Sequence, residues 1–253
     1  MKVIILAGGK GSRLDSITET IPKPLVKVTK LPILIHIIKI FIRFGHKDFI
    51  IALGYKGEKI LNYFHKGKIT HKIRNKLNKG FTLERNFLNK KCNITLLNTG
   101  QNTMTGGRLK RAAKLINDEN FFLTYGDGVS NVNLNKLLNQ HKKYKKLVTL
   151  TAVNPPSKFG ELKINQKKII SFQEKQKYTK KSWINGGFFV IQKEFIKHIK
   201  NDNTVLEKEP LETIAKKGQL YAYKHEGFWH CMDTKKDKES LEKIFKKKNT
   251  LLS

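Results

Sequence analysis

Short apolar runs alternate with stretches of helical spacing through the first half of the chain, and this alternation predicts its secondary structure. Near-continuous apolar runs are typical of strands buried on both faces, whereas apolar residues three and four positions apart indicate amphipathic helices. The strands predicted in this way are residues 1–6, 49–53, 93–97 and 121–125. The predicted helices are residues 33–44, with Pro32 in the first turn, 57–64 and 107–116. Strands that alternate with helices favour a parallel sheet with right-handed crossovers.

The second half of the chain is richer in strands. Residues 161–172 alternate like a hairpin, and further strands are expected at 148–153, 184–191 and 219–223. Helices are expected at 210–216 and 234–247. Because no Pro/Gly/Ser-rich linker separates the halves, we expect one domain over residues 1–253, with a shared sheet and a shared cleft. The expected fold is α/β, with a mixed, mainly parallel Rossmann-like sheet flanked by helices on both sides.

Residues 66–91 break this regularity. The segment is polar and basic, and its apolar residues follow neither the helical nor the strand period. We interpret it as a long excursion from the sheet or as a segment that contacts another subunit.

Composition narrows the class of protein. The chain has 253 residues, of which 39% are hydrophobic, which is typical of a globular protein. The longest apolar stretch, residues 31–44, is interrupted by charged side chains, so we expect no membrane span. The N-terminal apolar run is too short for a secretory signal. Two cysteines, Cys92 and Cys231, do not form a disulfide framework, which favours a reducing cytoplasm.

The net charge of +31 has two interpretations. A nucleic-acid-binding protein is one, and a globular protein whose surface is decorated with lysine is the other. We favour the second, because the lysines are scattered along the whole chain and no nucleic-acid-binding motif is present. The six arginines are more informative, since Arg13 and Arg108 lie inside glycine-rich motifs. The planar guanidinium binds phosphate in a bidentate way that lysine cannot copy.

A glycine-rich loop follows the first predicted strand. Glycines let the backbone approach a phosphate closely, and successive N–H groups then bind the anion. The spacing fits neither a Walker loop nor a dinucleotide fingerprint, and a plain tight turn is the alternative. The residues predicted to bind nucleotide here are Leu6, Ala7, Gly8, Gly9, Lys10, Gly11, Ser12 and Arg13.

Three further charged residues are candidates for phosphate chemistry. Lys23 lies between two prolines, which restrict the backbone, so its charge suits a phosphate. Asp127 follows a predicted strand between two glycines, and Asp233 precedes a predicted helix. A turn and an N-cap are the alternatives for these carboxylates. As a pair they suit Mg²⁺, which takes one or two carboxylates and completes its shell with water and phosphate. Zinc is disfavoured, because His230 and Cys231 have no second Cys/His pair at tetrahedral spacing.

The motifs, taken in order, resemble those of a known family. The pair LAGGKGSRL and PKPLV is similar to the signature of the sugar-1-phosphate nucleotidyltransferases. Later segments resemble the branch of that family that uses CTP and glucose 1-phosphate. These segments are NTGQNTMTGGRLKR, TYGDG, PPSKFGEL, SFQEK, WINGGFFV, EPL and HEGFWHCMDT.

The resemblance implies a fold and a reaction. It implies a nucleotide-diphospho-sugar transferase fold with a nucleotide-binding part at residues 1–130, a β-rich sugar-phosphate-binding part at 131–233 and a C-terminal helix at 234–253. The implied reaction joins CTP and α-D-glucose 1-phosphate to give CDP-glucose and pyrophosphate with Mg²⁺. The implied setting is a cytoplasmic homo-oligomer that binds neither membrane nor nucleic acid and supplies deoxysugars for the O-antigen of lipopolysaccharide. One alternative is a nucleotidyltransferase that uses another nucleotide or another sugar 1-phosphate. The other is a non-catalytic nucleic-acid-binding or sensor protein on the same scaffold.

The resemblance also implies roles for individual residues. Arg13, Lys23, Asp127 and Asp233 would be catalytic, and both aspartates would bind the metal ion. Thr103, Arg108 and Gly126 would bind nucleotide, with Arg108 as an anion contact. Glu174, Lys175, Asn185 and Gly187, together with Lys23, would bind the sugar phosphate. Gln176 stands where the family usually has proline, which leaves the backbone beside Lys175 freer.

Overall fold

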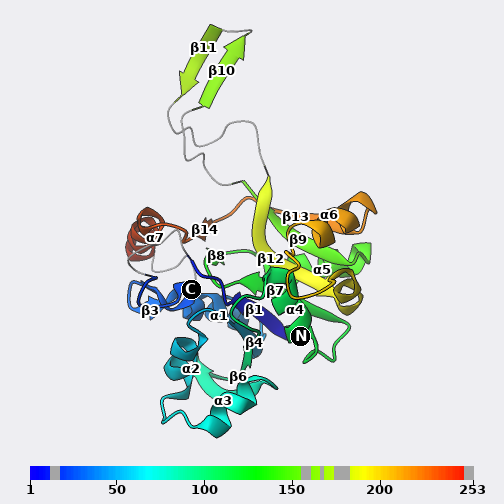
Figure 1. Cartoon of the computed structure of the whole chain (residues 1–253). Helices are drawn as coiled ribbons and strands as arrows, with labels where there is room; N and C mark the ends of the chain where they lie inside the picture. Colours follow the sequence, from blue (N-terminus) through cyan, green and yellow to red (C-terminus); the bar gives the residue numbers. More distant parts are fainter. Residues whose placement is uncertain (12–17, 155–160, 166–167, 174–182, 248–253) are drawn as a thin grey trace.

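A central eight-stranded sheet organises the chain (Figure 1). The computed structural model describes residues 1–11, 18–154, 161–165, 168–173 and 183–247. The strand order across the sheet is β13-β9-β12-β7-β1-β4-β6-β5. The bounds are β1 Val3–Ala7, β4 Asp48–Leu53, β5 Phe81–Phe87, β6 Lys90–Asn98, β7 Asn120–Tyr125, β9 Val148–Val153, β12 Ile184–Gln192 and β13 Leu220–His225.

The sheet is mixed and mainly parallel, as the sequence predicts. Strand β1 pairs in parallel with β4 and β7, β4 with β6, and β13 with β9, whereas β12 lies antiparallel between β7 and β9. Every residue of β1 is buried, which agrees with its unbroken apolar sequence. Strands from the second half of the chain therefore extend the sheet of the first half, and the expectation of a shared sheet is confirmed.

Helices cover both faces of the sheet. Alternate β1 side chains enter two different apolar clusters, Val3 and Ile5 on one side and Ile4 and Leu6 on the other. The first cluster is covered by α1 Ile33–Arg43, α2 Gly57–His65, α3 His71–Leu77, α5 Leu134–Tyr144 and α7 Lys235–Lys247. The second is covered by α4 Thr105–Ala113, the 3₁₀ helix η3 Lys193–His198 and α6 Glu209–Lys216. None of the helices in the described residues is long and apolar enough to cross a bilayer.

Small elements complete the architecture. The 3₁₀ helix η2 spans Lys23–Leu25, and β10 Glu161–Asn165 pairs with β11 Lys168–Gln173 as the expected hairpin. Two further two-stranded sheets join β2 Lys27–Val28 to β3 Leu31–Pro32 and β8 Gly128–Ser130 to β14 Trp229–Cys231.

The interpretation of residues 66–91 as a long excursion is wrong. The segment contains α3 and β5, and β5 pairs antiparallel with β6 along its whole length at one edge of the sheet. Half-buried and exposed residues alternate along β5. Phe81, Leu83 and Phe87 lie on the half-buried face, and Arg85 at the remaining half-buried position interrupts the apolar alternation in the sequence. The sequence prediction also lacked α5, β8 and β14.

Candidate active site

Loops at the carboxyl ends of β1 and β7 enclose the main cavity together with the segment before α4. Ligands of open α/β sheets bind at this edge, beyond the carboxyl ends of the parallel strands. The volume of the cavity is about 560 Å³. Its lining comprises residues 6–11, Lys23, Pro24, residues 101–105, Arg108 and residues 125–127. The structure therefore brings four separate sequence motifs to one cavity.

Lys23 bridges the two candidate metal-binding carboxylates. Its Nζ lies 2.6 Å from Asp127 Oδ2 and 2.7 Å from Asp233 Oδ1, and its side chain is 11% exposed. Burial alone lowers the pKa of a lysine, but the charge of Asp127 and the hydrogen bonds to both carboxylates outweigh burial and raise the pKa of Lys23. Two carboxylates from distant parts of the sequence thus form ion pairs with a single cationic group.

Pairing of β8 with β14 creates this convergence. Cys231 lies opposite Gly128, and the backbone N–H of Met232 donates to Asp127 O at 2.9 Å. The residues just before β8 and just after β14 are therefore held side by side. Thr234 and Asp237 hydrogen-bond to each other at the start of α7, in the manner of a capping box. The start of α7 is thereby capped by other residues than Asp233, whose carboxylate faces Lys23 instead.

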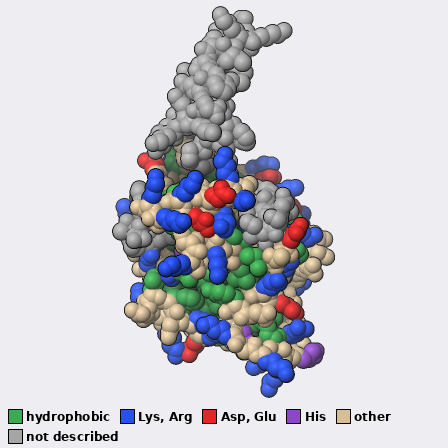
Figure 2. Space-filling view, turned by 90° about the vertical axis from the view of Figure 1, so that its left-hand side faces the viewer, with side chains coloured by type: hydrophobic (Ala, Val, Ile, Leu, Met, Phe, Trp, Pro, Cys, Tyr) green, Lys and Arg blue, Asp and Glu red, His purple; other side chains and the backbone are tan. Residues whose placement is uncertain are grey.

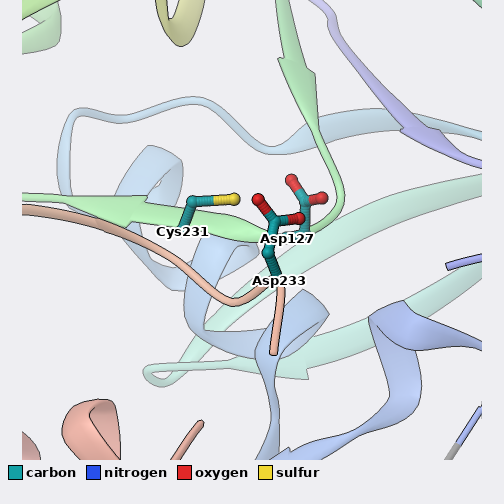
Figure 3. A group of neighbouring side chains, drawn as sticks. All are labelled: Asp127, Cys231 and Asp233. Atoms are coloured by element: carbon teal, nitrogen blue, oxygen red, sulfur yellow. The ribbon is translucent and has the colours of Figure 1, made fainter. Parts of the chain in front are cut away.

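Cys231 is a third potential ligand. Figure 3 shows its thiol directed toward the two carboxylates, and one ligand atom from each of the three residues lies within 4.8 Å of the others. Burial, and then the charge of Asp127, raise the pKa of the Cys231 thiol, so it is a neutral neighbour. The donor set fits Mg²⁺: the carboxylates supply hard oxygen ligands on one side, and the cavity leaves room for water and phosphate on the other.

The glycine-rich loop is fixed from the side of β4. Tyr55 N–H donates to Gly8 O at 3.0 Å, and Lys56 Nζ donates to Thr18 O at 2.7 Å and to Glu19 O. The segment after β4 thus holds the chain on both sides of residues 12–17, which lie outside the described residues. Gly11 has φ +65°, a conformation that favours glycine. Sequence reasoning did not single out Tyr55 and Lys56, because neither belongs to a recognisable motif.

Arg108 contributes to the cavity in a way that the sequence did not indicate. Its Nη1 donates to Leu53 O, Thr99 Oγ1 and Gly100 O, and its Nη2 donates to Gln101 O. A Cβ placed on Gly8 or Gly54 would lie 2.4 or 2.2 Å from Nη1, so both glycines make room for the guanidinium. Arg108 therefore joins the ends of β4 and β6 to the glycine-rich loop. Its predicted contact with an anion stays a prediction, and these bonds would have to rearrange for it.

The residues predicted for the sugar side are only partly described. Glu174 and Lys175 lie outside the described residues, as do Ser12 and Arg13 of the phosphate loop. Asn185 is oriented by two contacts: its Oδ1 accepts from Gly187 N–H at 2.9 Å, and its Nδ2 donates to Tyr125 Oη at 3.3 Å. Trp229 packs against the core, and its Nε1 donates to Gly186 O.

Comparison with known proteins finds similarity over nearly the whole length of the chain. The family described as "Nucleotidyl transferase" matches residues 2–240. Glucose-1-phosphate cytidylyltransferase of Salmonella typhimurium is 44% identical over 98% of this chain and 96% of its own. Probable glucose-1-phosphate cytidylyltransferase of Bacillus subtilis is 39% identical over 97% and 96%. The crystal structure of HddC from Yersinia pseudotuberculosis aligns over 96% of this chain and 99% of its own with a TM-score of 0.71 and 22% identity, which shows a common fold.

Proposed function

The chain belongs to the nucleotidyl transferase family, and from this premise we propose that it transfers CMP from CTP to α-D-glucose 1-phosphate, giving CDP-glucose and pyrophosphate. The similarity to the Salmonella enzyme over nearly the full length of both chains supports the choice of substrates. The observation that carries the proposal is the contact of Asp127 and Asp233 with one cationic group beside the glycine-rich loop.

The chemistry is an in-line displacement at phosphorus. An oxygen of the sugar phosphate attacks the α-phosphorus of CTP, the bond from that phosphorus to the β-phosphate bridging oxygen breaks, and pyrophosphate leaves with the electron pair. This reaction needs no protein nucleophile, so the protein contributes positioning and charge neutralisation. Backbone N–H groups of the loop from Gly8 to Gly11, continued by Ser12 and Arg13, would bind the β- and γ-phosphates. Glu174, Lys175, Asn185 and Gly187 would bind the sugar phosphate.

Asp127 and Asp233 would hold Mg²⁺. When bound, the ion neutralises charge on the α-phosphate and orients it for attack. Lys23 would then release the carboxylates and turn its ammonium toward the α-phosphate, where the growing negative charge is stabilised. The ion pairs seen here show that both carboxylates reach one cation, which is what the assignment requires.

Thr103, Arg108 and Gly126 line the cavity and would border the nucleotide. Both cysteines are free, which supports the proposed cytoplasmic location. A homo-oligomer and a supply of deoxysugars for the O-antigen of lipopolysaccharide complete the proposal.

A substrate panel tests the proposal. Purified protein is given CTP, UTP, dTTP or GTP with glucose 1-phosphate or mannose 1-phosphate, and release of pyrophosphate is followed. We expect CTP with glucose 1-phosphate to have the highest kcat/KM. A higher kcat/KM for another nucleotide and sugar phosphate would identify that pair as the substrates of the same reaction class. Tight, salt-sensitive polynucleotide binding without pyrophosphate release would favour a binding protein instead.

The metal assignment is tested separately with Asp127→Asn and Asp233→Asn. Each change keeps the side-chain volume and removes one anionic ligand, so we expect turnover at saturating substrates to fall by about a hundredfold or more. Asp48→Asn is a matched control, because Asp48 lies in β4 away from the cavity. Near-normal turnover of the Asp127 or the Asp233 variant over a Mg²⁺ titration would refute the assignment.

A further inference from the structure

Glu207 joins two walls of the cavity from a position just before α6. Its Oε2 accepts a hydrogen bond from Thr105 Oγ1 at 2.7 Å, and its Oε1 accepts one from Tyr125 Oη at 2.5 Å. Thr105 begins α4, beside the residues assigned to the nucleotide, and Tyr125 ends β7, directly before Gly126 and Asp127. One carboxylate therefore uses both oxygens to tie together two elements that line the cavity.

The contact continues from Tyr125 to the sugar side. Tyr125 Oη accepts from Asn185 Nδ2 at 3.3 Å, and Asn185 Oδ1 accepts from the backbone of Gly187 at 2.9 Å. Gly187 has φ +79°, and a Cβ there would lie 2.7 Å from Tyr125 Cδ2, so the missing side chain gives the ring its place. The tyrosine is thus fixed on one side by packing and at its hydroxyl by two polar partners.

The direction of the two hydrogen bonds at the Tyr125 hydroxyl follows from its chemistry. A phenol hydroxyl carries one proton, and Glu207 Oε1 is the acceptor to which Tyr125 Oη donates it. Because the hydroxyl donates its single proton to Glu207, the phenol oxygen can only accept from Asn185, and this fixes the orientation of the Asn185 amide.

We propose that Glu207 is a positioning residue for the sugar phosphate: it orients Tyr125, and through Tyr125 it orients Asn185. This inference rests on the proposed function, because it takes Asn185 as a sugar contact. Glu207 itself is exposed and does not line the cavity, so it acts through its neighbours and not on the reacting atoms. The expected effect of its loss is weaker binding of glucose 1-phosphate with little change in the chemical step.

Three variants test the proposal. Glu207→Gln keeps the size of the side chain and removes its charge, and Tyr125→Phe keeps the ring and removes the hydroxyl. Glu209→Gln is the matched control, since Glu209 lies two residues further on and pairs with the exposed Lys200. We expect the KM of glucose 1-phosphate to rise about tenfold in both test variants, the lower end of the effect of one hydrogen bond to a charged group. The KM of CTP and kcat should stay within about twofold, and Glu209→Gln should match the wild type.

The double variant of Glu207 and Tyr125 distinguishes a shared role from two separate ones. If Glu207 acts through Tyr125, the KM of glucose 1-phosphate in the double variant should equal that of the single variants. Multiplied effects, or a rise confined to the KM of CTP, would overturn the proposal. An inactive wild type would refute the proposed function and not the contact itself. Urea unfolding of the same variants tests the contact between Glu207 and Tyr125 independently of activity. Additive losses of unfolding free energy in the double variant would overturn the contact.

Discussion

At the scale of single residues, Lys23 is the internal counter-ion of the candidate metal site. Two carboxylates with side chains only 26% and 19% exposed would repel each other without a cation between them. The ammonium of Lys23 occupies this place in the structure and hydrogen-bonds to both. A divalent ion that binds Asp127 and Asp233 must therefore compete with a charge that the protein itself supplies.

Lys23→Met makes this competition measurable. Without the ammonium the two carboxylates lose the cation that they share, and we expect the apo protein to lose about 3 kcal/mol of unfolding free energy. Added Mg²⁺ should then raise the melting temperature of the variant more than that of the wild type, because no side chain has to be displaced. Lys27→Met, at an exposed position in β2, is the control. An equal stabilisation of all three proteins by Mg²⁺ would contradict the interpretation.

At the scale of elements, contacts between distant segments fix the site and the layers around it. The β8–β14 pair places Asp127 beside Asp233, and Arg108 of α4 joins the ends of β4 and β6. Helix α5 is fixed by His141, whose ring lies 3.0 Å from both Thr149 Oγ1 in β9 and Asn120 Oδ1 in β7. The ring is buried, so a neutral imidazole holds this helix on the sheet.

His141 should make the protein sensitive to mild acid. Burial lowers the pKa of His141 to about 4 in the folded state, whereas an unfolded histidine titrates near 6.5. Between these values the unfolded state binds more protons, so stability falls as the pH falls through this range. From pH 7 to pH 5 the contribution of this residue is at most about 2 kcal/mol of unfolding free energy.

Urea unfolding at pH 7 and pH 5 measures this effect. The wild type should lose more stability between the two values than His141→Gln, which has no group that titrates at this position. His71→Gln is the control, because His71 is exposed at the start of α3. The histidines His36, His46 and His225 also have lowered pKa values through burial, so His141→Gln should keep part of the slope. Identical slopes for wild type and His141→Gln would exclude the proposed role.

At the scale of the whole molecule, charge is the dominant surface property. Figure 2 shows Lys and Arg side chains spread over the face of the molecule instead of gathered in one stripe. This distribution agrees with the scatter of lysines along the sequence and with a net charge of +31. A diffuse positive field of this kind raises the encounter rate with small anions without forming a particular binding surface.

Added salt should therefore lower the rate at which the protein captures its substrates more than it lowers the rate of the chemical step. Raising NaCl from about 20 to about 200 mM shortens the Debye length to below 10 Å, and we expect kcat/KM for CTP to fall severalfold. The value of kcat should change much less, because the phosphates are then already bound inside the cavity. Sodium sulfate at matched ionic strength separates screening from specific ion effects. A kcat/KM that is independent of salt would show that the surface charge has no part in capture.

Much of the fold could be predicted from the sequence because its signals are local. Strands β1, β4 and β7 follow from buried apolar runs, and helices α1, α2 and α6 follow from helical spacing. The phosphate loop could be located because glycines with little steric restriction stand at a strand end. The prediction missed β5, where Arg85 interrupts the apolar alternation, and α5, where His141 takes a position of the buried helical face.

By itself the sequence determined the alternation of the main strands and helices, the position of the glycine-rich loop and the identity of Lys23, Asp127 and Asp233 as candidates, since each depends on a residue and its near neighbours. Only the tertiary structure decided that these three side chains meet, that Cys231 lies beside them, that Arg108 turns inward and that Glu207 contacts Tyr125. The physical reason is that such contacts depend on the pairing register and packing of segments distant in sequence, and no local pattern encodes these.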